Sequence, residues 1–200
     1  MLQAADLHCE RGGRALFRDL SFEVGAGSLL RIAGANGSGK TSLLRILCGL
    51  LTPTQGEVRW KGEPIRHLRE DYSRELVHVG HAVGLKDELT AAENLAFTCT
   101  LVGVAVSGAG VQDALARLGV AEQKPVKQLS QGQRRRAALA RLALSARVPL
   151  WLLDEPFAAL DSLAFGIVET LIGEHVARGG AVVFTTHQDP GLAGARVIEL

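Results

Sequence analysis

Residues 34–41 read GANGSGKT and restrict the fold of this chain more than any other stretch. They match the pattern G-x-x-x-x-G-K-[ST], follow an apolar run at residues 29–33, and precede a helical run whose leucines extend to Leu50 before Pro53. Glycines let the backbone amides of such a loop turn toward an anion, and the helix that begins near Lys40 adds its positive dipole end. In this pattern the lysine reaches the β- and γ-phosphates and the hydroxyl of Thr41 binds Mg²⁺. We therefore expect a nucleotide-phosphate site, rather than a glycine-rich surface turn, formed by Gly34, Ala35, Asn36, Gly37, Ser38, Gly39, Lys40, Thr41 and Ser42.

Composition narrows the class of protein. A length of 200 residues, with 47% hydrophobic and 22% charged residues, is typical of one globular domain with a sizeable core. The net charge of +1 argues against a generally basic, nucleic-acid-binding surface, although it leaves room for a local patch. The cysteines at 9, 48 and 99 form no C-x-x-C pair or disulfide framework, so free thiols in a reducing compartment are expected. We recognise no secretory leader and no apolar run of membrane length, so any membrane role is expected through a partner.

The hydrophobic pattern predicts an α/β fold. We expect a β-hairpin that turns at Gly12-Gly13, and a capping box of Thr90 and Glu93 that starts a helix at Ala91. The other predicted helices span 109–118, 133–146 and 162–178, and the predicted strands span 2–8, 15–24, 29–33, 56–60, 75–80, 149–153, 181–185 and 196–200. We interpret 1–200 as a single domain, with a core of 1–81 and 147–200 and a mainly helical subdomain at about 82–146.

Polar residues follow directly after four of the apolar strands. They are the loop at Gly34, His81, the pair Asp154-Glu155, and His187. Ligands of open α/β sheets bind at the carboxyl ends of the strands, so we expect these four stretches to converge on one edge of the sheet.

Two adjacent carboxylates end the strand before Pro156. An aspartate here holds Mg²⁺ opposite the phosphate loop, and a second carboxylate can act as general base on an attacking water. Asp154 and Glu155 therefore fit these two roles. The alternative is an acidic turn before a proline, which a complete phosphate loop in the same chain disfavours.

Ser130 and Gln133 also have capping-box spacing and predict a helix that begins near Gln131. Gly132 would allow close backbone approach, so this helix end could be a second anion site. A well-capped helix without any ligand explains the same residues, and spacing alone does not decide between the two. The following run at 134–136 is interpreted as a solvated helix face.

Together the motifs resemble those of the ATP-binding cassette (ABC) ATPases over the whole chain. GANGSGKT corresponds to that family's Walker A motif, LSQGQ to its signature, LWLLDEP to its Walker B segment, residues 158–161 to its D-loop, and Thr186-His187 to its switch histidine. The resemblance implies a P-loop NTPase cassette, in which an N-terminal antiparallel hairpin and an inserted helical subdomain accompany a mixed sheet. It further implies that two copies pair head to tail around two ATP molecules.

The resemblance also assigns roles to single residues. It implies catalytic roles for Lys40, Glu155 and His187, and Mg²⁺ ligation by Thr41 and Asp154. It implies that Ser130 and Gly132 contact the γ-phosphate in the partner's site, and that Gln133 and Asp161 also contact nucleotide. Two of these have simpler readings, since Asp161 fits an N-cap of the next helix and His187 a strand-end histidine bound to backbone.

Three positions depart from the family pattern. The family's adenine-stacking aromatic is missing from the hairpin, where the nearest residue is Arg11; its guanidinium could stack on the base or lie in a solvated turn. His81 replaces the family's Q-loop glutamine, and Gln131 occupies the second glycine position of the signature.

A narrower resemblance is to the ATPase subunits of the haem exporter complex of bacterial cytochrome c maturation. It is carried by GHAVGLKDELTAAENL, LSQGQRRRAALARL, LWLLDEPFAALD and TTHQ on so short a chain. It implies two ATPase subunits beneath integral-membrane partners, peripheral at the cytoplasmic face of the inner membrane, where ATP hydrolysis drives release of a haem-loaded chaperone on the far side. No C-x-x-C-H motif occurs, so we expect this chain to bind no haem. From the near-neutral net charge we expect no nucleic-acid partner either. The alternatives are the ATPase of another ABC exporter, a soluble cassette without transport, and a nucleotide switch with negligible turnover.

Overall fold

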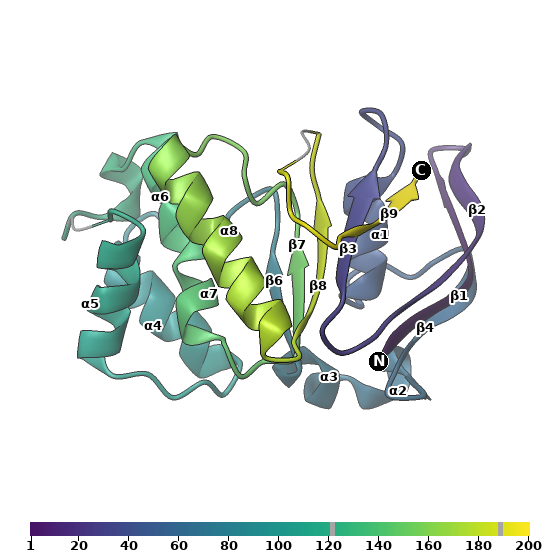
Figure 1. The fold of residues 1–200 in the computed structure, drawn as a ribbon, viewed down its shortest axis with the longest axis horizontal. Helices are drawn as coiled ribbons and strands as arrows, with labels where there is room; N and C mark the ends of the chain where they lie inside the picture. The colour runs from purple at the N-terminus through teal and green to yellow at the C-terminus, as the bar shows by residue number, and fades with distance from the viewer. Residues whose placement is uncertain (121–122, 188–189) are drawn as a thin grey trace.

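The computed structural model describes residues 1–120, 123–187 and 190–200, so Gln188 of the TTHQ stretch lies outside the described residues. A parallel sheet stands at the centre of the molecule. Helices from the middle of the chain lie on one side of it and an antiparallel sheet lies on the other (Figure 1).

The antiparallel sheet has the order β2-β1-β4-β5. Its strands are β1 (Leu2–Arg11), β2 (Arg14–Val24), β4 (Gln55–Trp60) and β5 (Glu63–Pro64). The predicted hairpin is confirmed, because Gly12 and Gly13 join β1 to β2 with φ values of 59° and 73°, as a tight two-residue turn requires. The strand β5 and the helices α2 (Ile65–Leu68) and α3 (Glu70–Arg74) were not predicted, since each is too short to show a periodicity.

The parallel sheet has the order β6-β7-β8-β3-β9, and every neighbouring pair is parallel. Its strands are β3 (Leu29–Ala33), β6 (Leu76–Val79), β7 (Leu150–Leu153), β8 (Ala181–Thr185) and β9 (Arg196–Glu199). On β7, Leu150 and Leu152 pack into the core facing the antiparallel sheet, whereas Trp151 and Leu153 pack into the core facing the helices. Burial of both faces explains why this strand reads as a continuous apolar run.

Helix α1 (Lys40–Leu47) lies between the two sheets and contacts β1, β7 and β8. The prediction that this helix extends to Leu50 was wrong. Gly49 has a φ of 73°, and the amide of Leu50 donates back to the Arg45 carbonyl at 2.8 Å. This Schellman ending stops the helix at Leu47 and leaves Leu50 67% exposed.

The helices that follow β6 in the chain cover the other face of the parallel sheet (Figure 1). Between β6 and β7 the chain forms α4 (Ala91–Leu101), α5 (Gly108–Arg117), a 3₁₀ turn (Val126–Gln128), α6 (Gln131–Leu139) and α7 (Arg141–Leu144), and α8 (Ser162–Ala177) follows β7. The capping boxes of α4 and α6 are both confirmed, but the single helix predicted at 133–146 is two helices that meet at Ala140. In the described parts of the chain, no helix is long and apolar enough to cross a bilayer.

The core of the helical side contains a buried histidine. His175 of α8 is 1% exposed, and its ring stacks on Trp151 with centroids 3.8 Å apart and planes 4° from parallel. A Cβ at Gly180 would lie 2.1 Å from His175 Nε2, so glycine at 180 leaves room for the ring. Burial lowers the pKa of His175 from 6.5 to about 4.

This histidine should make the protein less stable in weak acid. Between pH 6.5 and 4 the unfolded chain binds a proton at His175 that the folded chain does not, so the free energy of unfolding should fall as the pH falls, by about 1 kcal/mol per pH unit. Urea unfolding at several pH values between 7.5 and 4.5 measures this slope. His175→Phe keeps an aromatic ring against Trp151 but cannot titrate, so it should flatten the slope. Burial also lowers the pKa of His78, but this effect contributes equally to the wild type and to His175→Phe. If the free energy of unfolding depended on pH with the same slope in both proteins, the assignment to His175 would be contradicted.

Candidate active site

The carboxyl ends of four adjacent strands, β6, β7, β8 and β3, open into one pocket of about 470 Å³. The predicted convergence is therefore confirmed, because residues that follow each of these strands line the same space. The lining consists of Leu16, Asn36, Gly37, Gly39, Lys40, Thr41, Ser42, His81, Asp154, Glu155, Ala158 and His187.

The loop between β3 and α1 requires glycine at two positions for steric reasons. Gly34 has a φ of 141°, and a Cβ there would lie 2.6 Å from the Leu200 carbonyl oxygen and 2.7 Å from Ser38 Oγ. Gly39 has a φ of 113°, and its Cβ would lie 3.1 Å from Leu16 Cβ. A larger residue at either position would push the loop away from its neighbours, so these glycines fix the path of the loop.

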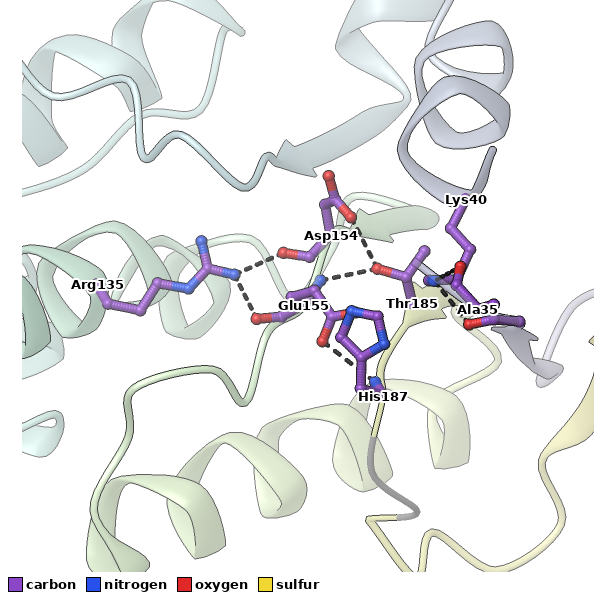
Figure 2. A network of polar contacts seen from close by, with 8 residues as sticks. Ala35, Lys40, Arg135, Asp154, Glu155, Thr185 and His187 are labelled. Atoms are coloured by element: carbon purple, nitrogen blue, oxygen red, sulfur yellow. Dashed lines mark hydrogen bonds and ion pairs between the residues drawn. The ribbon is translucent and has the colours of Figure 1, made fainter. Parts of the chain in front are cut away.

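Lys40 is the first residue of α1, and its ammonium turns back into the loop. The side chain is 7% exposed, and Nζ donates to the carbonyl oxygens of Gly34 and Ala35, each at 2.8 Å (Figure 2). Both of these carbonyl acceptors are neutral, so they solvate the charge without neutralising it. A negative group bound in this loop would therefore meet a full positive charge and the positive end of the helix dipole.

Thr185 joins the two carboxylates at the end of β7, and the sequence analysis missed it. Its Oγ1 donates to Asp154 Oδ1 at 2.8 Å and accepts from the amide of Glu155 at 2.9 Å (Figure 2). Thr185 is fully buried and Asp154 is 2% exposed. A threonine that ends an otherwise apolar strand could have been recognised as a polar contact, had the pairing of β7 with β8 been known.

Glu155 adopts a backbone conformation that is rare for a residue with a side chain. Its φ is 51°, in the left-handed region, and such strain is most common at functional sites. One carboxylate oxygen lies 3.3 Å from His187 Nε2, and the amide of His187 donates to the other at 3.4 Å. The carboxylate thus faces the pocket beside an imidazole that is half exposed, where it can accept a proton from a bound water.

Two oxygen donors of the pocket fit a magnesium ion. The Thr41 hydroxyl at the start of α1 and the Asp154 carboxylate at the end of β7 line the same space. Mg²⁺ prefers oxygen ligands and usually takes one or two from protein, with phosphate and water completing the octahedron. The donor set therefore suits Mg²⁺ that arrives with a nucleotide.

Within the predicted loop, Gly34, Ala35 and Ser38 are not among the residues that line the pocket. The residues predicted to bind a partner's nucleotide do not line it either. Ser130 and Gln133 form the capping box at the start of α6, and a Cβ at Gly132 would lie 3.3 Å from the Ala159 carbonyl oxygen. Asp161 caps α8 through the Ala164 amide at 2.8 Å, as its simpler reading predicted. Its other oxygen pairs with Arg136 Nη1 at 2.7 Å.

The hairpin presents Leu16 to the pocket. Arg11, at the end of β1, is exposed, pairs in register with Arg14 and is not among the residues that line the pocket. The base-stacking role therefore stays a prediction for Arg11, and Leu16 is a second candidate for contact with the base.

The prediction that residues 134–136 form a solvated face was wrong for Arg135. This residue is 5% exposed, and its guanidinium donates to three backbone carbonyls between 2.6 and 2.7 Å away. Figure 2 shows two of these hydrogen bonds, to Asp154 and Glu155. The apolar positions Ala138, Leu139 and Leu142 follow Arg135 by three, four and seven residues. That spacing puts Arg135 on the buried face of the helix, and it could have been noticed in the sequence.

Comparisons with known proteins agree with this geometry. The profile of the ABC transporter family matches residues 17–158, which is more than half of the chain. The cytochrome c biogenesis ATP-binding export protein CcmA of Aromatoleum aromaticum is 54% identical over 96% of this chain and 91% of its own length. The protein of the same name from Nitrosospira multiformis is 48% identical over 100% and 97%.

Solved structures agree as well. A dimeric bacterial ABC transporter cassette superposes with a TM-score of 0.86 at 28% identity, covering 100% of this chain and 94% of its own. A dimeric cassette in a post-hydrolysis state bound to ADP and phosphate gives 0.86 at 26% identity with the same coverage.

Proposed function

The chain belongs to the ABC transporter family of ATP-binding proteins, and we propose that it is the ATP-hydrolysing subunit of a haem exporter in cytochrome c biogenesis. As a member of that family it binds and hydrolyses ATP. The observation that carries the proposal is the single pocket in which a phosphate loop, two carboxylates and a histidine meet. The export step follows from the relatives' names, and release of a haem-loaded chaperone is the step we propose that hydrolysis drives.

The roles of the pocket residues follow from their positions. Residues 34–42 hold the phosphates, with Lys40 opposite the terminal ones, and Thr41 and Asp154 would hold Mg²⁺, which neutralises phosphate charge. Glu155 takes a proton from the attacking water, and its position is supported by the amide of His187. His187 and His81 contact the terminal phosphate from the strand ends beside it.

The second half of the site comes from a partner copy in this proposal. Ser130, Gly132 and Gln133 start a capped helix, yet they lie outside the pocket of their own chain. A head-to-tail dimer would bring this helix end, together with Asp161, to the partner's triphosphate. Support comes from the two similar cassettes, both of which are dimeric.

We also propose a division of the chain into a core of 1–81 and 147–200 and a helical subdomain of about 82–146, in a subunit peripheral to the cytoplasmic face of the inner membrane. Integral-membrane subunits are its proposed partners.

Co-purification tests the export function. A tagged chain expressed in its own host should bring down integral-membrane subunits from detergent-solubilised membranes, in a complex with two copies of the chain. Subunits of an unrelated transporter would indicate another exporter, and ribosomal or nucleic-acid material would favour a soluble cassette. Either result would overturn the proposed role.

Substitution of the hairpin tests how the base is held. If the guanidinium stacks on adenine, Arg11→Ala should weaken ATP binding about fivefold, since such a contact contributes about 1 kcal/mol at an exposed site. Leu16→Ala is the comparison, because Leu16 lines the pocket from the same hairpin. A titration with a fluorescent ATP analogue measures both. An unaltered dissociation constant for Arg11→Ala, with a raised one for Leu16→Ala, would move the base contact to Leu16.

A further inference from the structure

Arg135 makes a connection that the functions assigned above do not use. It lies in the second turn of α6, and Nη1 donates to the Gly80 carbonyl at 2.7 Å. Nη2 donates to the carbonyls of Asp154 at 2.6 Å and Glu155 at 2.7 Å. One buried guanidinium thus binds the main chain after β6 and the main chain after β7.

We propose that Arg135 is a positioning residue for ATP hydrolysis, because it fixes the main chain from which the Glu155 carboxylate extends and ties it to the helix that begins at Ser130. This inference deepens the proposed function and rests on it. Arg135 itself touches no reacting atom in this scheme.

The contacts hold both sides of Glu155. Thr185 Oγ1 accepts from the amide of Glu155 at 2.9 Å, and Arg135 binds its carbonyl. The residue between these two contacts has a φ of 51°, which is unfavourable for a residue with a Cβ and relaxes unless its surroundings hold it. Fixing both peptide groups determines where the side chain starts, and therefore where the carboxylate lies relative to the phosphates.

The chemistry of the acceptors favours positioning over simple charge pairing. The Arg135 guanidinium donates to three backbone carbonyls, which its planar fork of donors can bind at several points at once. Burial lowers the pKa of Arg135, whereas the charges of Asp154 and Glu155 act in the opposite direction. A lysine would keep the charge but offer one donor atom in place of a fork, so it could not reproduce this arrangement.

The same side chain connects two parts of the site. Gly80 directly precedes His81, which lines the pocket, and α6 carries the residues proposed to contact the partner's nucleotide. A shift of α6 would therefore move the main chain at Gly80 and at Glu155 together. This gives a physical route by which closure over the second nucleotide could align the general base.

The neighbouring arginine provides a matched control. Arg134 lies on the same helix, but it pairs with Asp87 at 3.1 Å on the surface and binds the Leu129 carbonyl at 3.2 Å. Arg134→Lys makes the same chemical change as Arg135→Lys without touching the main chain at Glu155.

The test compares steady-state ATP hydrolysis by these variants in the complex that co-purifies with the tagged chain. We expect Arg135→Lys to lower kcat about 10- to 100-fold with KM for ATP within about twofold of wild type, as small misplacement of a catalytic group does. Arg134→Lys should stay within about twofold of wild type in both constants. In a Glu155→Gln background, adding Arg135→Lys should change the residual rate less than about twofold, because no base remains to be misplaced.

Several outcomes would overturn the inference. One is a kcat for Arg135→Lys equal to that of Arg134→Lys. Another is that Arg135→Lys lowers kcat by the same factor in the Glu155→Gln background as in the wild type. A third is that Arg135→Lys raises KM for ATP and leaves kcat unchanged. If the lysine variant shows no cooperative urea transition, Arg135→Gln replaces it, and failure of both to fold would mean that a purely structural contact explains the geometry. Wild-type turnover by Glu155→Gln itself would instead refute the proposed base, whereas an inactive Glu155→Gln with a fully active Arg135→Lys would refute only the positioning role.

Discussion

Lys40→Ala should raise the dissociation constant for ATP at least about 100-fold, which corresponds to about 2.7 kcal/mol of binding free energy. In the wild type Lys40 is 7% exposed and its ammonium is held by two neutral carbonyls, so the charge is directed into the loop that receives the phosphates. Removing it leaves the loop amides and the helix dipole, which together lack the full unit of charge that a triphosphate meets in the wild type.

Equilibrium titration with a fluorescent ATP analogue measures this loss. Lys61→Ala is a suitable control, because Lys61 is exposed in the turn after β4, pairs with Glu75 at 2.9 Å and does not line the pocket. Circular dichroism and urea unfolding establish that the Lys40 variant is folded, which matters since a buried side chain is lost. A folded Lys40→Ala protein with wild-type affinity would remove the phosphate-loop assignment.

The parts of the site that could be predicted from the sequence are the polar residues that directly follow an apolar strand. Each of Gly34, His81, Asp154 and His187 follows an apolar run, and parallel strands place their carboxyl ends on one edge. The prediction needed only the positions of the runs, not the order of the strands. The capping boxes at Thr90 and Ser130 were predicted for a similar reason, since their hydrogen bonds join residues three apart in the chain.

The contacts that were missed join elements far apart in the sequence. Thr185 meets Asp154 because β7 and β8 are neighbours, and Arg135 of α6 binds the main chain at Gly80 and Asp154, which follow β6 and β7. Local pattern carries no information about such pairs. Three consecutive arginines carry so much charge that they predict a solvated helix face. One of the three nevertheless lies on the buried face.

Short-range effects caused the errors in element boundaries. Leucine spacing continues to Leu50, but the left-handed Gly49 ends α1 at Leu47, and spacing alone cannot give a glycine's φ. Helices α2 and α3 have four and five residues, which is fewer than two turns. A hydrophobic periodicity of 3.6 residues cannot be recognised over so short a stretch.

Glu155→Gln should lower kcat for ATP hydrolysis about 1,000-fold while leaving ATP binding within about twofold of wild type, which is within the range for loss of a general base. The amide has nearly the shape of the carboxylate and can still contact His187, but it cannot accept a proton from water. Binding should persist, because the phosphates are held by the loop and Lys40 rather than by Glu155. Since hydrolysis is what separates the proposed dimer, ATP should also shift this variant from monomer to dimer on size exclusion.

Glu174→Gln controls for the loss of a negative charge. Glu174 lies on α8, where it pairs with Arg178 at 3.1 Å and Arg117 at 3.6 Å, outside the pocket. It should retain wild-type turnover and should not dimerise more readily with ATP. Hydrolysis and dimerisation are separate measurements, and each tests a different part of the proposal. Wild-type turnover by Glu155→Gln would remove this residue from the base role, whereas a slow variant that stays monomeric with ATP would keep the base and refute the head-to-tail dimer.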